Sequence, residues 1–227
     1  MQIQDVLVNN PKLSYYNHNS IDNNIELLYL SGSVDIEFIQ SDDQFIIVMS
    51  DTQDGLDSIE VNKRQSILDI TQKSNYNVTI NTNIVNRWFG KTVYSNNTII
   101  SQSSNAKVKV VIALKTLPKV ELSGSCSLLS NSIYQDEIDL KVSGSGDIKL
   151  SGKVIDSNLK VSGSGNINIK KLESNSIFAK VSGSGNIKCY ANLSAIAKVS
   201  GSGNITIFGN PTNRDISKSG SGNIKFN

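Results

Sequence analysis

A glycine-rich string recurs in the C-terminal half of this 227-residue chain and is the first feature that could do chemistry. It reads VSGSGDI at 142–148, VSGSGNI at 161–167, 181–187 and 199–205, and KSGSGNI at 218–224. Glycine-rich loops cradle phosphate in nucleotide-binding proteins, but such a loop occurs once, between a strand and a helix. Because five copies run here from one strand-like segment to the next, we interpret the string as a unit of architecture.

Side chains for nucleophilic or metal-assisted catalysis are scarce. His18 is the only histidine, so a Ser-His-Asp triad or a histidine zinc site would lack its central residue. Carboxylates remain, since two of them suffice for glycoside hydrolysis. The acidic residues of the N-terminal half that could act in this way are Asp35, Glu37, Asp42, Asp43, Asp51, Asp54, Asp57 and Glu60. We interpret them as residues of solvated strand faces and turns. We therefore predict no catalytic, cofactor-binding or metal-binding residue.

Lysines form the most suggestive outward feature. Residues 1–140 carry ten Lys or Arg against sixteen Asp or Glu, whereas residues 141–227 carry twelve against four, so the repeat half is the basic half. Stacked charges of one sign would attract an anionic polymer, although lysines also keep a β surface soluble and discourage edge association. One set shares a position of the unit: Lys141, Lys160, Lys180 and Lys198. The other lies eight residues on: Lys149, Lys188 and Lys225.

A second candidate contact is NRWFGKTVY at 86–94, where Arg87, Trp88 and Phe89 precede a glycine. Aromatic residues in an excursion between strands mark contact sites when they are exposed. They would instead cap an end of the fold if they were packed. The SGSG units carry no arginine and almost no aromatic residue, which argues against nucleic acid as a partner.

The spacing of the repeat indicates which elements must carry these residues. The first glycines of successive units are 18 to 20 residues apart, and a degenerate copy, ELSGSCSL, extends the series to Gly124. YLSGSVDIEF around Gly32 is an isolated echo. Six units with this period define the coils of a solenoid, and the excess of Asn, Ser, Ile and Val over proline agrees with strands and turns.

Parity within KVSGSGDIKL indicates a strand with one buried face, because small or apolar residues alternate with polar ones. Val142 and Ile148 would belong to inward columns that stack through the coils and begin at Leu122 and Leu128. The inward glycines would let the opposite wall approach or let the strand bend with positive φ. The Asx residues would form an amide ladder or left-handed turns; they are Asp147, Asn166, Asn186, Asn204 and Asn223.

Other segments complete the expected domain. Cys126 and Cys189 would lie three coils apart, too far for a disulfide, and are predicted to be packed thiols. We predict a flexible leader over 1–20 and one domain over 21–227, with irregular coils over 21–122 and regular SGSGN coils over 123–227. The terminal GNIKFN lacks a cap and Lys218 replaces an inward valine, so we also predict a homo-oligomer through this open end.

The SGSGN units at this spacing, together with GSVDIEFIQSDDQFIIVMSD at 32–51, resemble the putative auto-transporter adhesin head GIN domain family. The resemblance covers about residues 25–227. It implies an all-β, right-handed, single-stranded parallel β-helix (solenoid), usually exported to the bacterial cell envelope and without established catalytic activity. MQIQDVLVNN lacks the features of a secretory signal, so a cytoplasmic location stays open, and no apolar run is long enough for a membrane helix.

We therefore expect a non-enzymatic binding module of the cell envelope or surface, a putative adhesin for anionic glycans or other surface partners. It would need no cofactor. A purely structural solenoid and a carbohydrate-active β-helix enzyme stay open as alternatives.

Overall fold

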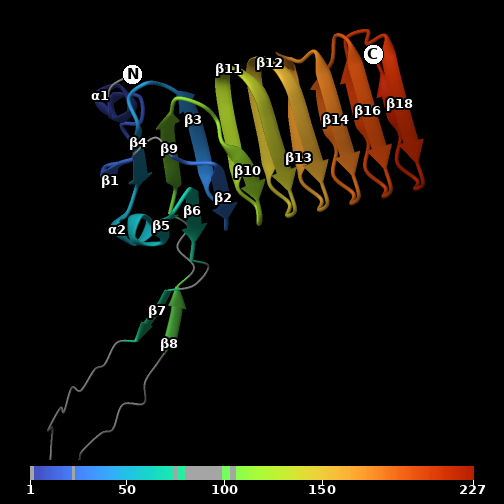
Figure 1. The fold of residues 1–227 in the computed structure, drawn as a ribbon. Helices are drawn as coiled ribbons and strands as arrows, with labels where there is room; N and C mark the ends of the chain where they lie inside the picture. Colours follow the sequence, from blue (N-terminus) through green and yellow to red (C-terminus); the bar gives the residue numbers. More distant parts are fainter. Residues whose placement is uncertain (1–2, 22–23, 74–75, 80–98, 103–105) are drawn as a thin grey trace, which may run out of the picture.

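Two sheets wound from one chain face each other across a shared core in the computed structural model, which describes residues 3–21, 24–73, 76–79, 99–102 and 106–227 (Figure 1). The all-β prediction is confirmed, with a parallel β-solenoid of about five turns over residues 120–226. Each turn has one strand before the SGSG turn and one after it. We call the resulting layers the pre-turn sheet and the post-turn sheet.

The pre-turn sheet is a parallel ladder in which each strand pairs with its counterpart one coil away. Its strands are β2 (Leu27–Ser31), β10 (Lys119–Leu122), the ends of β11 (Ser127–Val142) and β12 (Asp147–Val161), β14 (Ser176–Val181), β16 (Ser194–Val199) and β18 (Asn213–Lys218).

The post-turn sheet is the matching ladder on the other side of the core. Its strands are β3 (Asp35–Gln40), the starts of β11 and β12, β13 (Asn166–Glu173), β15 (Ile187–Tyr190), β17 (Ile205–Phe208) and β19 (Ile224–Phe226).

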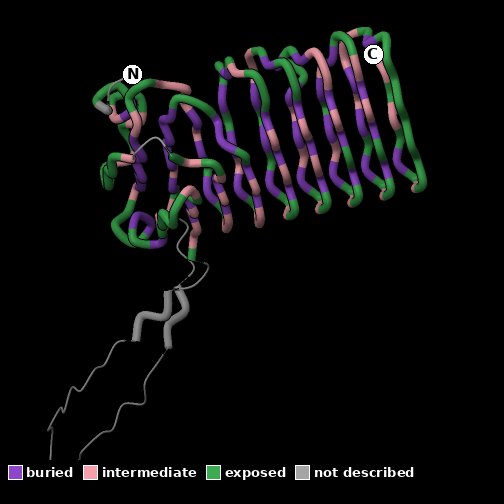
Figure 2. Tube along the Cα trace, in the orientation of Figure 1, coloured by how far each residue is buried: buried purple, intermediate pink, exposed green. Residues whose placement is uncertain are grey.

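Alternating burial along these strands confirms the parity prediction (Figure 2). The valine that precedes each SGSG turn and the isoleucine that follows it point inward and are at most 2% exposed in every internal coil. Each such side chain contributes about 1.5 to 3 kcal/mol by leaving water. The two columns are therefore part of the main core; they comprise Val142, Val161, Val181 and Val199, and Ile148, Ile167, Ile187 and Ile205.

The SGSG glycines serve a different purpose from either of the two predicted. Positive φ occurs at Gly32 and Gly124 but at none of the SGSG glycines in the five regular units. A Cβ at Gly183 would overlap the carbonyl oxygen of Gly163, the glycine of the preceding coil, and not a side chain of the opposite wall. The turns stack backbone on backbone, and only glycine leaves room for that approach.

The N-terminal half is a mixed sheet, and not the succession of irregular coils that the sequence suggested. β6 (Ile67–Gln72) pairs in parallel with β2, and β9 (Val108–Leu114) pairs in parallel with β3, so they form a coil beneath Gly32. Antiparallel strands then pair with the edges of this coil: β5 (Ile59–Arg64) pairs with β6, and β4 (Phe45–Ser50) pairs with β9. The Gly32 echo is a true coil, since the Ser125 amide donates to the Gly32 carbonyl at 2.7 Å.

The first residues pack against this mixed sheet, in contrast to the flexible leader expected for 1–20. β1 (Tyr15–Ser20) pairs antiparallel with β4, and α1 (Ile3–Val8) inserts Val6, 2% exposed, into a second apolar cluster with β4 and β9. This cluster exists because FIIVMS in β4 is apolar on both faces. One face of β4 therefore joins the main core and the other is covered by α1 (Figure 1).

Smaller elements and the cysteines complete the description. α2 (Gln53–Asp57) follows β4, and β7 (Tyr76–Thr79) pairs antiparallel with β8 (Ile99–Gln102). Cys126 and Cys189 are buried and free, as predicted, and burial raises the pKa of Cys189 to about 12. Across the described part of the chain, no helix is long and apolar enough to cross a membrane.

The last coil leaves a strand edge open. Lys218 lies in register with Val199, where earlier coils carry valine, and every residue of β18 is exposed. The Arg214 guanidinium lies 4.3 Å from the centroid of the Phe226 ring, which itself packs against the main core. Association of two copies through this edge stays a prediction.

Candidate functional site

The lysine column is the set of outward lysines on consecutive strands of the pre-turn sheet, and its predicted alignment is confirmed. It consists of Lys141, Lys160, Lys180 and Lys198, each paired in register with the next. Adjacent strands lie about 4.8 Å apart. Two charges at that separation repel by somewhat under about 1 kcal/mol in water, and less in salt. The column is therefore a tolerated concentration of positive charge.

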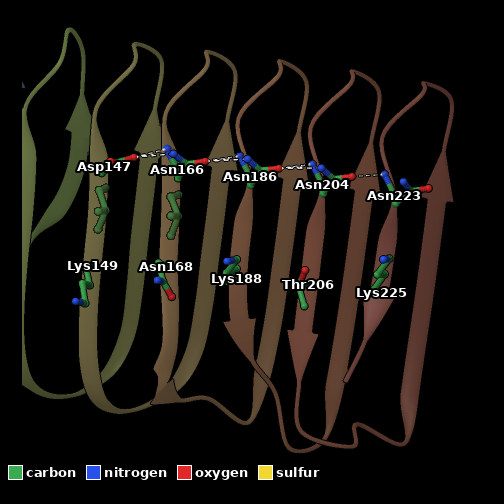
Figure 3. Close-up of a pocket in the computed structure, with 12 residues that line it drawn as sticks. Asp147, Lys149, Asn166, Asn168, Asn186, Lys188, Asn204, Thr206, Asn223 and Lys225 are labelled. Carbon is green, nitrogen blue, oxygen red and sulfur yellow. Dashed lines mark hydrogen bonds between the residues drawn. The ribbon is translucent and has the colours of Figure 1, made fainter.

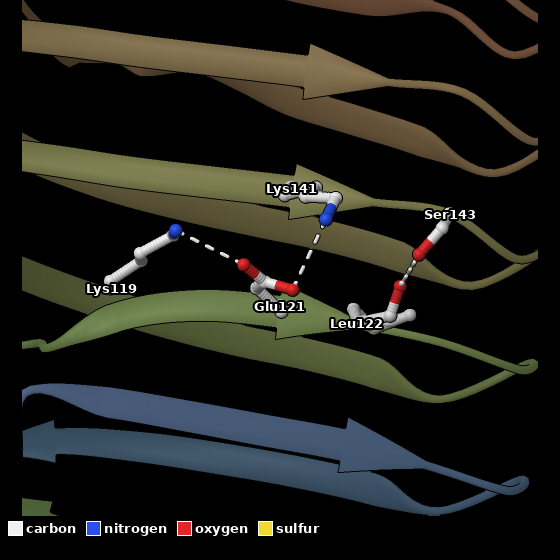
Figure 4. Close-up of polar contacts among 5 residues, drawn as sticks. All are labelled: Lys119, Glu121, Leu122, Lys141 and Ser143. Atoms are coloured by element: carbon white, nitrogen blue, oxygen red, sulfur yellow. Dashed lines mark hydrogen bonds and ion pairs between the residues drawn. The ribbon is translucent and has the colours of Figure 1, made fainter. Parts of the chain in front are cut away.

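Glu121 neutralises only the N-terminal end of the lysine column (Figure 4). Its carboxylate accepts from Lys141 at 3.2 Å and lies 3.0 Å from the Lys119 ammonium. Burial of Glu121 opposes ionisation, but the hydrogen bonds from these two lysines outweigh it and lower the pKa of the carboxyl. In the described part of the chain, Lys160, Lys180 and Lys198 have no ion-pair partner.

The lowered pKa of Glu121 predicts acid sensitivity. A carboxyl with a depressed pKa in the folded state adds stability that is present above its unfolded value, ordinarily 4.5, and is lost as pH falls through the folded value. Between pH 5 and pH 2, the free energy of unfolding should thus fall less steeply for Glu121→Gln than for the unaltered protein. Urea titrations at several pH values measure this. A slope for Glu121→Gln as steep as that of the unaltered protein would contradict the prediction.

A groove of about 710 Å³ runs along the outside of the post-turn sheet (Figure 3). The second lysine set lines it, but these lysines are not adjacent. Polar residues separate them, so the row that we call the alternating row reads Lys149, Asn168, Lys188, Thr206 and Lys225 on five successive strands. Positive charge therefore recurs at every second coil, about 9.6 Å apart.

The Asx residues line the other side of this groove, and they form the predicted amide ladder rather than left-handed turns. The Nδ2 of Asn166 donates to Asp147 Oδ1 at 2.8 Å, that of Asn186 to Asn166 at 2.9 Å, and that of Asn204 to Asn186 at 3.0 Å. Each acceptor oxygen also takes the next backbone N–H, at 3.1 Å in these three coils. None of these residues has positive φ.

The hydrogen bonds of the ladder all run in one direction, because each Nδ2 donates to the residue of the preceding coil. In each ladder bond the side-chain N–H points toward the N-terminal coil, and the Asp147 carboxylate is the final acceptor. At the other end Asn204 Oδ1 accepts from the backbone N–H of Asn223 at 3.0 Å, and the Lys218 ammonium donates to Asn223 Oδ1 at 3.4 Å. A negative group at the donor end and a positive group at the acceptor end stabilise the aligned amide dipoles.

A second groove, of about 1010 Å³, lies on the pre-turn sheet beside the lysine column. Its N-terminal part is acidic, with Asp136, Glu137, Asp139 and Asp156, and its C-terminal part is apolar, with Phe178 and Ile196. Among the residues that the structure describes, no group of three or more His, Cys, Asp or Glu side chains could hold a metal ion.

The acidic residues considered for hydrolysis are dispersed. Glu37 pairs with Lys109 at 2.8 Å, Asp42 with Lys115 at 3.6 Å, and Asp51 accepts from the backbone of Lys107. None of the eight lines either groove. Glu37 and Asp42 are therefore members of surface ion pairs.

Sequence reasoning located the lysines but missed their neighbours. Asn168 and Thr206 occupy the same position of the unit as Lys149, so the alternation was visible in the repeat. Glu121 likewise occupies the position of Lys141. The predicted contact residues Arg87, Trp88 and Phe89 lie outside the described residues.

Comparison with known proteins agrees with the coil geometry. A family model described as "Putative auto-transporter adhesin, head GIN domain" matches residues 25–211. The chain belongs to this family. The family's description is that of adhesins and not of enzymes. None of the curated proteins matches this GIN-domain chain.

Solved structures similar to this GIN-domain protein share its fold. A putative adhesin from Bacteroides fragilis is 21% identical, with a TM-score of 0.67 over 94% of this chain and 96% of that one. A putative lipid binding protein from Parabacteroides distasonis is 19% identical, with a TM-score of 0.55 over 94% and 97%. A putative adhesin from Parabacteroides merdae is 18% identical, with a TM-score of 0.52 over 96% and 97%.

Proposed function

We propose that this protein is a non-enzymatic binding module of the bacterial cell surface that contacts anionic glycans through its lysine column. One observation carries the proposal: four lysines lie on consecutive strands, and three of them have no ion-pair partner among the described residues. The adhesin description of the family supports a surface location. The dispersed carboxylates give no support to a hydrolase.

Electrostatics explains why such a column suits a polymer better than a small molecule. The charges lie along a line of consecutive strands and point outward from the sheet, and neither of the two grooves is lined by them. A flexible polyanion can follow the line and neutralise several charges at once, which also relieves their mutual repulsion. Serine on the strand side of each turn, as at Ser162 and Ser182, adds exposed hydroxyl groups beside the lysines.

Charge reversal in the middle of the column tests this proposal. The double substitution Lys160→Glu and Lys180→Glu should weaken binding to heparin or another acidic polysaccharide by about tenfold or more at low salt. Isothermal titration calorimetry across a salt series measures the effect. The control reverses as many charges at exposed positions of the N-terminal half, Lys107→Glu with Lys115→Glu, and should change affinity far less.

The result also separates the proposal from a spacer role. Equal losses in the two double variants would show that net charge alone matters, and the lysine column would then have no special part. If the unaltered protein bound no acidic polysaccharide at low salt, a structural solenoid would be the better account.

A further inference from the structure

The groove between the amide ladder and the alternating row differs chemically from the lysine column on the opposite sheet. We propose that it selects linear glycans that carry one anionic group on every second sugar. This inference rests on the proposed function, because it assumes that the protein binds anionic glycans. It adds a second binding face and a rule for which glycans that face accepts.

The spacing of positive charge carries the first step. Lys149, Lys188 and Lys225 lie two coils apart, or about 9.6 Å from one to the next. One sugar of an extended glycan advances about as far as one coil. A glycan lying along the groove would therefore place every second sugar beside a lysine, so an alternating charge pattern matches the row. A glycan charged on every sugar would instead bring half of its carboxylates to Asn168 and Thr206.

The amide ladder supplies neutral contacts at every coil. Each ladder oxygen from Asp147 to Asn186 already accepts two hydrogen bonds, one from a side chain and one from the backbone. Each Nδ2 in the ladder donates only one of its two hydrogens to the neighbouring coil. The second hydrogen is left for a ligand. The ladder thus offers one donor per coil to sugar hydroxyl and ring oxygens.

Asn168 provides an acceptor between two lysines. Its Oδ1 is shielded from solvent and has no hydrogen-bond partner, and the residue lines the groove between the lysines of the neighbouring coils. A shielded acceptor without a partner is costly, and a turn of the carboxamide toward the groove would bring it within reach of a sugar hydroxyl. Thr206, two coils on, places a hydroxyl at the equivalent point. Neutral sugars therefore have partners where the charge is absent.

Aromatic side chains border the same face. Tyr190 and Phe208 pair in register, lie two residues beyond Lys188 and Thr206, and are half-buried, whereas the intervening Cys189 and Ile207 are buried. Both rings therefore lie on the outward side of the post-turn sheet. Aromatic faces pack against the C–H faces of sugars, which favours a glycan over a more compact polyanion. Beside the lysine column, the ring centroid of Phe178 lies 5.8 Å from Lys198 Nζ.

Two matched triple variants and two probes test the inference. The groove variant carries Lys149→Gln, Lys188→Gln and Lys225→Gln, and the column variant carries Lys160→Gln, Lys180→Gln and Lys198→Gln. One probe is a hyaluronan decasaccharide, charged on every second sugar, and the other is an oligogalacturonate of equal length, charged on every sugar. Calorimetry gives the affinities, and circular dichroism with thermal melts verifies that both variants fold.

We expect the groove variant to lose about tenfold or more in affinity for hyaluronan, and the column variant to lose several times less. For oligogalacturonate the order should reverse. Equal losses in the two variants with both probes would overturn the groove inference and leave anionic glycan binding intact. If the unaltered protein bound neither probe at low salt, the proposed function would fail as well.

Discussion

Replacement of Gly185 by alanine is expected to lower the free energy of unfolding by about 3 kcal/mol or more. The added Cβ would overlap the carbonyl oxygen of Gly165 in the preceding coil and crowd a methyl group of Val161. The amide of Gly185 also donates to the Gly163 carbonyl at 3.1 Å, so a coil that shifted to make room would lose pairing. A backbone atom cannot move aside as a flexible side chain can, and the substitution thus strains the stack itself. Urea-induced unfolding followed by circular dichroism measures the loss.

Two controls make this test specific. Gly222→Ala meets the same overlap with Gly203 but in the last coil, which has a free edge and can shift, so a smaller loss is expected there. Ser184→Ala, at an exposed position of the same turn, should stay within about 0.5 kcal/mol of the unaltered protein. Unchanged stability of Gly185→Ala would show that the turns do not stack as closely as described.

Substitution of Asn186 by leucine should cost about 2 to 3 kcal/mol, the second largest effect on stability that we expect. Asn186 Oδ1 accepts from the Asn204 side chain at 3.0 Å and from its backbone at 3.1 Å, and its Nδ2 donates to Asn166 at 2.9 Å. Leucine removes all three bonds and leaves the Asn204 amide without its acceptor. Thermal and urea unfolding report the change.

Asn186→Asp separates the two halves of this interaction. It keeps the acceptor for Asn204 but loses the donor to Asn166 Oδ1, so an intermediate loss is expected, increased by repulsion between the carboxylate and that oxygen. Asn192→Leu, at an exposed position without ladder bonds, is the control and should change stability by less than about 0.5 kcal/mol. A leucine at 186 that proved as harmless as one at 192 would mean that the ladder contributes nothing to stability.

The regular coils could be predicted from sequence because the SGSG motif occurs once in each coil and so aligns the residues of one coil with those of the next. The period sets which residues stack, and parity sets which side chains point inward, so the valine and isoleucine columns and the alignment of the lysines followed directly. The purpose of the glycines did not follow. Parity indicates the inward face, but it does not show that the nearest atoms belong to the preceding coil.

The N-terminal half was harder to predict because its pairing is not local. β6 pairs with β2 and β9 pairs with β3, although β4, α2 and β5 lie between β3 and β6 in the sequence. β4 lacks alternation because both of its faces are buried, so its sequence indicated a strand but not its neighbours. α1, six residues long, resembles a strand in composition and becomes helical in contact with β4 and β9.

For the candidate site, the sequence supplied the charges and the structure supplied their surroundings. Lys141 was aligned correctly with Lys160, but its partner Glu121 belongs to a coil whose turn is degenerate. The groove of the alternating row depends on how far Asn168 and Thr206 project between longer lysines, and that depth is a property of the folded sheet.

Salt dependence of binding by the unaltered protein tests the central claim most directly. If the lysine column and the groove bind anionic glycans, the association constant for an acidic polysaccharide should fall as the salt concentration rises. A plot of the logarithm of this constant against the logarithm of the salt concentration should be a straight line with a negative slope. For a densely charged polysaccharide such as heparin, neutralisation of four lysines predicts a slope of about −3 if each contact counts as it does for a single-stranded nucleic acid. A neutral glycan of the same length should not bind detectably. A slope near zero, or no binding to the acidic polysaccharide at low salt, would contradict the account.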